Sequence, residues 1–479
     1  MERYRASYYN LRVPHGAVTL LFNGTTGALL ALDRDLAQAW TPFLGEQRER
    51  EAGIGYGSWE PRPFAATDLP ALIADQLPAF VDAGIFVSEG SDERAALRAS
   101  YAKNRARAPF FVTITTTLDC NMRCYYCYQK EGMLEHMSPE TCDAIIAWTK
   151  QQIEERAYPR LYVDWYGGEP MLNQPIIERY TAAMTDYCDA RGIAYKGSMI
   201  CNGTAWPQDA VDFVTRNRLH IIQFSLDGPE RHHNKRRGLI DPGGGPGRSA
   251  SFQQVMGVID KLIGSIRIYL RVNVDPWIGR DALEVIDECA ERGWLGPDTK
   301  FYPYVAVINA MTEHCGFVGK AAKFQAFDAE FDEIQREFYA VLRRFRDQRS
   351  LEIVQYFPNR VTINCAAVSN NAVVFGPNGL AYKCGLDVGD HHRAHAAVGA
   401  HGALDGAMPS ETLPANRWDL YDPFSHPRCS ECQYLPVCMG GCPKAQIDKE
   451  AAQIRMQSAF WENNFDRIIR EYYAAAGHA

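Results

Sequence analysis

Six short apolar runs recur along the middle of the chain, at 110–116, 161–165, 198–201, 220–226, 266–274 and 301–307. Amphipathic segments separate them, and the clearest begins at Ser138, which can cap a helix whose first residue is Pro139. Strands that alternate with helices predict a parallel α/β sheet, curled or barrel-like. In such a sheet, chemistry is expected at the carboxyl ends of the strands.

The N-terminal part of the chain has a different pattern. Residues 17–32 predict two apolar strands around a glycine-containing turn, and a helix is expected from Asp33. Residues 69–88 predict a second helical stretch with an apolar end. Together these elements predict a small winged-helix-like module over 1–95. The charged segment that follows, 96–108, is expected to be a linker with helical character.

The rest of the chain divides into three predicted parts. The strand and helix pattern covers 109–319, one long helical segment covers 320–350, and a cysteine-rich segment covers 351–479. A length of 479 residues also exceeds what one compact core normally holds. We therefore expect an α/β protein: a partial (β/α)6 TIM-type barrel between an N-terminal winged-helix-like module and a C-terminal cysteine-rich domain.

The composition is that of an ordinary globular protein, with 46% hydrophobic and 23% charged residues. No apolar run approaches the roughly 20 residues that span a bilayer, so no membrane role is expected. Acidic residues outnumber basic ones by 58 to 50, which gives no electrostatic reason to expect a nucleic-acid partner. The N-terminus leads into polar and aromatic residues, which predicts no signal peptide and a cytoplasmic location. In a reducing compartment, closely spaced cysteines are more often metal ligands than disulfides.

Three cysteines follow the first predicted strand directly: Cys120, Cys124 and Cys127, separated by three and two residues. Three thiolates can hold three irons of a [4Fe–4S] cluster and leave the fourth iron open to a small molecule. Zinc normally takes four closed ligands, so it fits three cysteines poorly. The pattern favours an iron–sulfur cluster over zinc or chance.

This motif resembles that of the radical S-adenosylmethionine (SAM) superfamily. The resemblance implies that the open iron binds the amino and carboxylate groups of SAM, and that one-electron reduction cleaves SAM to methionine and a 5′-deoxyadenosyl radical. It also implies that Tyr126 packs near the adenine, although core packing is the alternative for a single tyrosine.

Further motifs of this family follow the later strands. The resemblance implies SAM contacts for Gly167, Gly168, Glu169, Asn202, Ser225 and Arg271. The first three form a Gly-Gly-Glu motif that holds the methionine amino group in the family, with glycines that permit close backbone approach. The resemblance implies that Asn202 contacts the ribose of SAM, that Ser225 contacts SAM, and that Arg271 contacts its carboxylate. Turn-forming roles stay open for the asparagine and the serine.

A basic group at 231–237 follows the fourth strand. We expect a solvated loop there, and the alternative is a His-Asp/Asn-x-x-Arg element that the family often carries at this place.

The second cysteine group resembles the SPASM domain, an auxiliary-cluster module of radical SAM enzymes that modify peptides and proteins. Its six cysteines are Cys365, Cys384, Cys429, Cys432, Cys438 and Cys442. The resemblance implies that Cys365, Cys384 and Cys442 bind auxiliary cluster one. It implies that Cys429, Cys432 and Cys438 bind auxiliary cluster two. One or two auxiliary [4Fe–4S] clusters are therefore expected beside the SAM-binding one, with zinc as the alternative.

The sequence departs from the SPASM pattern at two places. Phe460 stands where the family usually supplies a seventh cysteine, so cluster two uses a non-cysteine ligand, borrows Cys315 or is incomplete. Asn359 stands where some relatives have a fourth cysteine for cluster one, and an open iron there is suited to a substrate thiolate.

Two smaller groups remain. The run 390–395, with three histidines, is expected to be a solvated loop, with a metal site as the alternative. The isolated cysteines are expected to be small core residues: Cys142, Cys188, Cys201, Cys289 and Cys315.

The resemblance implies a ribosomally made peptide or small protein subunit as substrate, recognised by the winged module through β-addition. An electron donor such as flavodoxin or ferredoxin is expected. Related sulfatase maturases carry an aspartate directly after the cysteine at 384; Gly385 stands there, which counts against a sulfatase role unless Asp387, the candidate catalytic residue, substitutes for that aspartate.

Length and layout are most similar to the maturation enzymes of quinohemoprotein amine dehydrogenase. This resemblance implies thioether crosslinks from cysteine to Asp or Glu carbons. The alternatives are carbon–carbon crosslinking or epimerisation of a peptide, formylglycine formation, and a non-enzymatic iron–sulfur or zinc scaffold that binds a peptide.

Overall fold

The computed structural model describes residues 2–44, 62–129, 134–240, 251–296, 298–308, 321–342, 344–345, 357–399, 404–405, 417–448 and 451–475. The chain forms two compact units. The first consists of Met1–Ala108, Gln355–Asn371 and Asn416–Ala479, and the second of Pro109–Val354 and Ala372–Ala415. Among the described helices, none is long and apolar enough to cross a bilayer.

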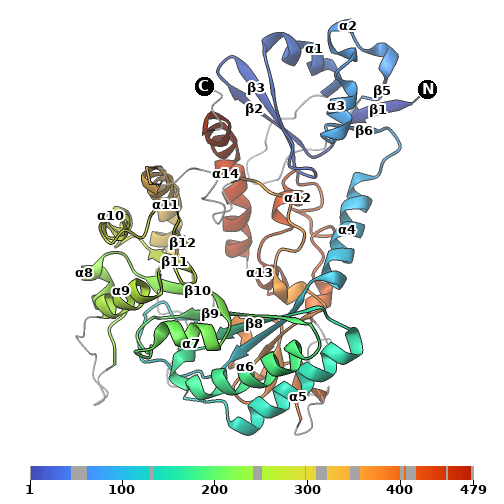
Figure 1. The fold of residues 1–479 in the computed structure, drawn as a ribbon. Coiled ribbons are helices and arrows are strands. Elements are labelled where there is room, and N and C mark those ends of the chain that lie inside the picture. The colour runs from blue at the N-terminus through green and yellow to red at the C-terminus, as the bar shows by residue number, and fades with distance from the viewer. Residues whose placement is uncertain are drawn as a thin grey trace. The chain divides into compact units, whose positions relative to one another are not determined.

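The second unit is built on six parallel strands that lie side by side in chain order (Figure 1). They are β7 (Phe110–Thr115), β8 (Arg160–Tyr166), β9 (Ala194–Cys201), β10 (Leu219–Leu226), β11 (Arg267–Val274) and β12 (Phe301–Val307). All six predicted strands are confirmed within a few residues. The unit is an α/β fold, a partial (β/α)6 barrel of the TIM type.

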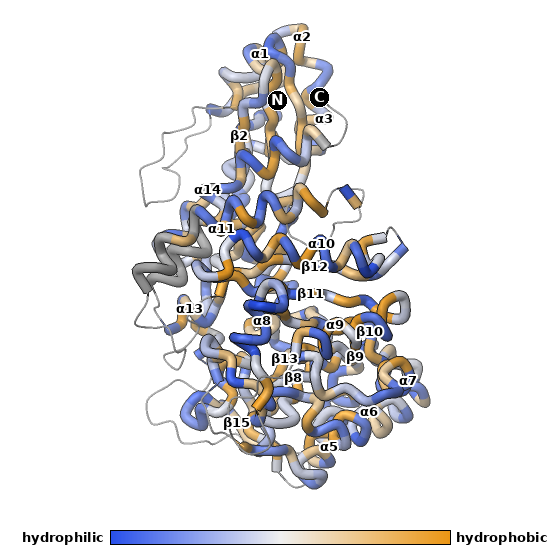
Figure 2. Tube along the Cα trace, turned by 90° about the vertical axis from the view of Figure 1, so that its left-hand side faces the viewer, coloured by the Kyte–Doolittle hydropathy of each residue, from blue (hydrophilic) through white to orange (hydrophobic). Residues whose placement is uncertain are grey.

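Helices connect successive strands: α5 (Pro139–Arg156), α6 (Gln174–Asp189), α7 (Ala210–Arg216), α8 (Glu230–Arg236), α9 (Ser251–Leu262) and α10 (Glu284–Glu291), with α11 (Ala321–Leu342) after the last strand. The predicted start of α5 is confirmed, because Ser138 Oγ accepts a hydrogen bond from the Thr141 amide at 3.2 Å. Alternate strand residues such as Leu161, Val163 and Trp165 are fully buried. Helix α8 is hydrophilic throughout its length (Figure 2).

Four short strands extend this sheet beyond β7. They are β13 (Ala372–Phe375), β14 (Leu380–Tyr382), β15 (Ala396–Val398) and β16 (Leu404–Asp405). The first pairs with β7 in parallel, and the other three continue in antiparallel order. The sequence analysis did not predict these strands.

The first unit contains two three-stranded sheets. One consists of β5 (Phe64–Ala65), β1 (Arg3–Ala6) and β6 (Phe86–Ser88), and the other of β2 (Asn10–His15), β3 (Val18–Asn23) and β4 (Leu29–Leu32). The predicted hairpin is confirmed as the antiparallel pair β3 and β4. The predicted helix after it is α1 (Arg34–Leu44).

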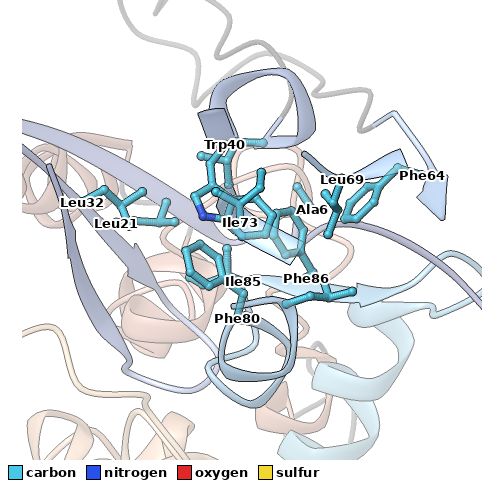
Figure 3. Packing of buried hydrophobic residues seen from close by; sticks show 12 residues of the cluster. Ala6, Leu21, Leu32, Trp40, Phe64, Leu69, Ile73, Phe80, Ile85 and Phe86 are labelled. Carbon is cyan, nitrogen blue, oxygen red and sulfur yellow. The ribbon is translucent and has the colours of Figure 1, made fainter. Parts of the chain in front are cut away.

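Aromatic side chains form one core of this unit (Figure 3). The Trp40 and Phe80 rings stack with their centroids 4.3 Å apart, and Phe86 lies 5.1 Å from Trp40. The helical stretch predicted before Phe86 is two short helices, α2 (Ala71–Ala74) and α3 (Leu77–Asp82). Pro78 explains the break, because it lacks the amide hydrogen that a continuous helix requires.

A second core joins the hairpin to the C-terminal segment. Helix α14 (Ala451–Ala475) packs Trp461 and Phe465 against β2 and β3, together with side chains next to α12 (Leu435–Cys438). Helices α4 (Glu93–Arg107) and α13 (Pro443–Ile447) complete the unit. The helical character expected before residue 109 is therefore observed as α4.

Candidate active site

The three cysteines of the first motif lie on the loop that leaves β7. Their side chains are partly buried, and burial raises the pKa of the Cys120 thiol to about 12 and that of Cys124 to about 11. Without a compensating positive charge these groups therefore stay protonated at neutral pH. Iron supplies such a charge, so metal binding is coupled to loss of the thiol protons.

The two glycines of the Gly-Gly-Glu motif let the loop after β8 touch the cysteine loop. The Gly168 amide donates to Thr117 O at 3.0 Å and the Glu169 amide to Asp119 O at 2.9 Å. A Cβ atom on Gly168 would lie 2.1 Å from Asp119 O, and one on Gly167 would lie 2.3 Å from Thr117 O. No side chain fits at either position, so glycine holds the cysteine loop in place.

Glu169 connects the ends of β8 and β9. Its side chain is fully buried, with Oε1 accepting from the Met171 amide at 3.1 Å and Oε2 from the Asn202 amide at 2.6 Å. Burial raises the pKa of this carboxyl group to about 7. The carboxylate thus ties two strand ends together, and a SAM contact for it stays a prediction.

Asn202 forms the turn after β9 and touches the cysteine loop. Its Oδ1 accepts from the Thr204 amide at 2.9 Å, and its Nδ2 donates to Asn121 Oδ1 at 2.7 Å. Nδ2 also lies 3.8 Å from Cys120 Sγ. The turn-forming alternative is therefore observed for Asn202, and a ribose contact stays a prediction.

Tyr126 belongs to a buried polar network at the same edge of the sheet. Its hydroxyl donates to Asp227 Oδ1 at 2.7 Å and accepts from Arg237 Nη1 at 2.6 Å. Asn273 Nδ2 lies 3.0 Å from both the hydroxyl and Asp227 Oδ1. Burial raises the pKa of Tyr126 well above its usual value, so the hydroxyl stays protonated.

The basic group at 231–237 is not a solvated loop, and that prediction is wrong. It forms α8 and the residue after it, and His233 is fully buried with Nδ1 accepting from the Asp227 amide at 3.2 Å. Arg236 pairs with Asp275 and Arg237 with Tyr126. Buried carboxylates draw these cations inward, whereas a stretch of charged residues alone indicates a solvated surface.

Sequence analysis missed Asp227, Asn273 and Asp275 as site residues. All three are almost fully buried at the ends of β10 and β11. Asp227 could have been found from its place in the Ser-Leu-Asp-Gly-Pro motif, but the sequence analysis assigned a role only to the serine of that motif. Asn273 and Asp275 follow Arg271 closely in the sequence, but only the arginine was considered as a site residue there.

Ser225 and Arg271 lie directly opposite each other on the parallel strands β10 and β11. Arg271 Nε donates to Asn273 Oδ1 at 2.8 Å. The structure therefore brings both predicted residues to one place, next to the Tyr126 network. Their contacts with SAM stay predictions.

Cys384 follows β14 in the second unit and lies near two half-buried tyrosines. The Tyr128 hydroxyl donates to the Tyr166 hydroxyl at 2.6 Å, and the charges of both Cys384 and Cys127 raise the pKa of Tyr128 further after burial. Asp387, the candidate catalytic residue, is 1% exposed, and one carboxylate oxygen lies 3.3 Å from Arg393 Nη1. Its catalytic role stays a prediction.

The remaining SPASM cysteines lie in the first unit. After burial, Cys438 raises the pKa of both Cys429 and Cys432, and Cys442 raises that of Cys365. The predicted grouping with Cys384 stays a prediction. Four isolated cysteines are buried as expected: Cys142, Cys188, Cys201 and Cys289. Cys315 lies outside the described residues.

No three His, Cys, Asp or Glu side chains among the described residues are grouped to hold a single metal ion. This gives no support to a metal site at 390–395, where His391 Nε2 instead lies 3.3 Å from Asn378. The finding does not count against iron–sulfur clusters, because each thiolate of such a cluster binds a different iron.

Residues 114–275 match the sequence profile of the Radical SAM superfamily. The chain contains a radical SAM domain. SAM and a [4Fe–4S] cluster are the cofactors of this superfamily and of the domain. The residues present fit them: three thiols share one loop at the carboxyl ends of the strands. Two buried polar atoms beside that loop lack a hydrogen-bond partner within the described part of the chain, His233 Nε2 and Arg237 Nε, while Asp227 Oδ2 and Arg236 Nε form an ion pair at 3.6 Å.

The relatives of the radical SAM domain include maturation enzymes. The chain is 23% identical over 230 residues to the sporulation killing factor maturation protein SkfB of Bacillus subtilis, covering 47% of this chain and 48% of SkfB. It thus spans about half the length of that relative. It is 18% identical over 374 residues to the cysteine-type anaerobic sulfatase-maturating enzyme of Clostridium perfringens, covering 73% of this chain and 94% of that enzyme.

The fold is also that of a solved structure. The sulfatase-maturating enzyme anSMEcpe with bound AdoMet superposes with a TM-score of 0.53 at 18% identity, over 77% of this chain and 98% of that one. This likeness confirms the radical SAM fold.

Proposed function

We propose that the chain is a radical SAM maturase that modifies a peptide or a small protein. The observation that carries this proposal is the cysteine loop fixed by Gly167, Gly168 and the Tyr126 network, combined with a second cysteine group in the same chain. Enzymes named as maturases among the relatives support it. When bound, SAM and its cluster supply a radical that abstracts a hydrogen atom, and an auxiliary cluster supplies an acceptor for a second electron.

The site's own residues prepare this chemistry by positioning the cysteine loop. Glu169 and Asn202 hold the strand ends beside Cys120, and the buried Tyr126–Asp227 pair anchors the other side of the cysteine loop. Each of these groups has its main partners in the protein before a ligand arrives. Preorganised polar groups of this kind cost little rearrangement during reaction.

We further propose that the product is a thioether between a cysteine sulfur and an Asp or Glu carbon of the substrate. One S–H and one C–H bond are replaced by one C–S bond, so two hydrogen atoms leave. SAM and one electron from the donor would take up one hydrogen atom and give methionine and 5′-deoxyadenosine, the auxiliary cluster would accept the remaining electron, and the thiol proton would go to solvent. The absence of a fourth cysteine beside Cys365, Cys384 and Cys442 in the sequence motif supports an iron that can take a substrate thiolate.

The sheets of the first unit supply an edge for the substrate. Each sheet ends in an outer strand on either side, and a leader peptide can add to such an edge by main-chain hydrogen bonds. We propose a ribosomally made peptide as the partner there, and a flavodoxin or ferredoxin as the electron donor.

Mass spectrometry of a co-expressed cysteine-containing peptide from a neighbouring reading frame tests the function. The proposal predicts a loss of two hydrogens per bond and protection of one cysteine per bond from iodoacetamide. Unchanged mass with inverted residues would indicate epimerisation, and an aldehyde would indicate formylglycine. An unmodified peptide alongside active SAM cleavage would contradict the thioether proposal.

A further inference from the structure

A tight turn joins the last two cysteines of the first unit. Helix α12 ends at Cys438, and Met439, Gly440 and Gly441 follow with φ of 48°, 81° and 71° before Cys442. These left-handed residues turn the chain back directly after the helix. Carbonyl oxygens at a helix end have no partner within the helix, so this turn needs donors from elsewhere.

Two side chains bind the first and last carbonyl oxygens of the turn. Asn364 Nδ2 lies 2.7 Å from Gly441 O and 3.1 Å from Met439 O. The Tyr421 hydroxyl also donates to Met439 O, and it accepts from Asn364 Nδ2 at 2.8 Å. These bonds fix the turn between the two cysteines.

Gln446, on α13, binds the middle of the turn and a cysteine sulfur at the same time. Its Nε2 donates to Gly440 O at 2.6 Å and to Cys429 Sγ at 3.8 Å. A side-chain amide has two N–H groups, one for each of these acceptors. A Cβ atom on Gly440 would lie 2.6 Å from Nε2 and 2.8 Å from the Tyr421 hydroxyl, so the glycine leaves room for the amide.

A hydrogen bond to sulfur matters most when the sulfur is charged. A thiol is a weak acceptor, whereas hydrogen bonds to ionised groups are roughly twice as strong as those between neutral groups. The Ala367 amide likewise donates to Cys365 Sγ at 3.4 Å. Donors at two separate sulfurs of this unit therefore fit thiolates that bind an iron–sulfur cluster.

We propose that Gln446 raises the reduction potential of the auxiliary cluster held by Cys429 through an N–H···S hydrogen bond from its side-chain amide. This inference rests on the auxiliary cluster of the proposed function. One-electron reduction adds negative charge to the cluster and its thiolates, and a donor directed at a thiolate stabilises that charge. Gln446 thus favours acceptance of the electron that is left when the carbon–sulfur bond forms.

The test uses the full chain with Cys120, Cys124 and Cys127 replaced by alanine, so that iron–sulfur signals come from auxiliary clusters. In this background Gln446→Met removes both N–H groups, and Gln446→Lys keeps a donor and adds a positive charge. Tyr421→Phe is the matched control, because the donor that it removes serves a carbonyl oxygen of the same turn. Iron content, the electron paramagnetic resonance spectrum of the reduced protein and the midpoint potential are measured anaerobically.

Gln446→Met is expected to lower one auxiliary potential. The equilibrium constant for one-electron reduction should fall about tenfold, which is a shift of about 59 mV. Gln446→Lys is expected to raise the same potential, and Tyr421→Phe to leave it at the parent's value. A parent-like potential in Gln446→Met, or an equal fall in Tyr421→Phe, would overturn the proposal.

The lysine variant decides the question if Gln446→Met holds no cluster. A potential above the parent's would then support the proposal, and an unchanged or lower one would contradict it. If the background protein itself binds no iron, the auxiliary cluster and this inference both fail. The proposed radical function is judged separately, by release of 5′-deoxyadenosine from the chain with intact Cys120, Cys124 and Cys127.

Discussion

The hydroxyl of Tyr126 donates a hydrogen bond to the buried carboxylate of Asp227 over 2.7 Å. The tyrosine lies on the cysteine loop after β7, and the aspartate lies at the end of β10. One short contact therefore joins the metal-binding loop to a strand three positions away in the sheet. Arg237 and Asn273 bind the same hydroxyl, so it is the centre of the network.

Tyr126→Phe tests this network. The ring is retained, but Asp227 loses a donor and Arg237 loses an acceptor, both in a buried place. We expect the free energy of unfolding to fall by about 1–3 kcal/mol, measured by urea denaturation of the SAM-free protein. Tyr472→Phe, at a 44% exposed tyrosine, is the control and should change little. Equal effects of the two variants would show that the network does not stabilise the fold.

Gly168→Ala tests the close contact between the loop after β8 and the cysteine loop. The new methyl group would lie 2.1 Å from Asp119 O, a backbone atom that cannot move without shifting the cysteine loop. We expect the purified variant to lose most of the iron bound through Cys120, Cys124 and Cys127. Gly257→Ala on α9 has no atom within 4 Å of the new methyl group and should keep its iron. Normal iron content in Gly168→Ala would show that this close contact is not required for iron binding.

Glu169 predicts a pH dependence of stability in the SAM-free protein. Its pKa is raised by burial from 4.5 to about 7, so its stabilising contribution is fully present below pH 4.5 and is lost as the pH rises through about 7. At 1.36 kcal/mol per pKa unit this amounts to roughly 3 kcal/mol. Urea denaturation at pH 5 and pH 8 should show this fall in the wild type and a smaller one in Glu169→Gln. Parallel pH profiles would contradict the raised pKa.

Asp387 and Asp390 both contact Arg393, but only the first is buried. If Asp387 takes part in substrate chemistry, Asp387→Asn should reduce peptide modification at least tenfold while 5′-deoxyadenosine release continues. Asp390→Asn should leave both nearly normal. The two products are quantified in the same reaction by liquid chromatography and mass spectrometry. Unimpaired modification by Asp387→Asn would exclude the predicted role.

Much of the barrel could be predicted because its strands carry local signals. The run 301–307 is apolar and corresponds to β12, and Ser138 and Pro139 mark the start of α5. The motif residues also follow strand ends, so a parallel sheet places Cys120, Gly168 and Asn202 at one edge. The parallel register of β10 and β11 then places Ser225 opposite Arg271.

Other features depend on contacts between distant residues. Strand β13 has only four residues and exists because it pairs with β7, far away in the sequence. The charges of 231–237 indicate a solvated segment until Asp227 and Asp275 are known to lie buried beside them. Pairing between distant groups, which decides both cases, leaves no periodic pattern in the sequence.

The most direct test of the central claim is the release of 5′-deoxyadenosine from SAM by the reduced, anaerobically reconstituted chain. We predict release by the wild type and by Cys188→Ala, which changes an isolated buried cysteine, and none when Cys120, Cys124 and Cys127 are replaced by alanine. Failure of the iron-loaded wild type to cleave SAM, or undiminished cleavage by the triple variant, would contradict the account.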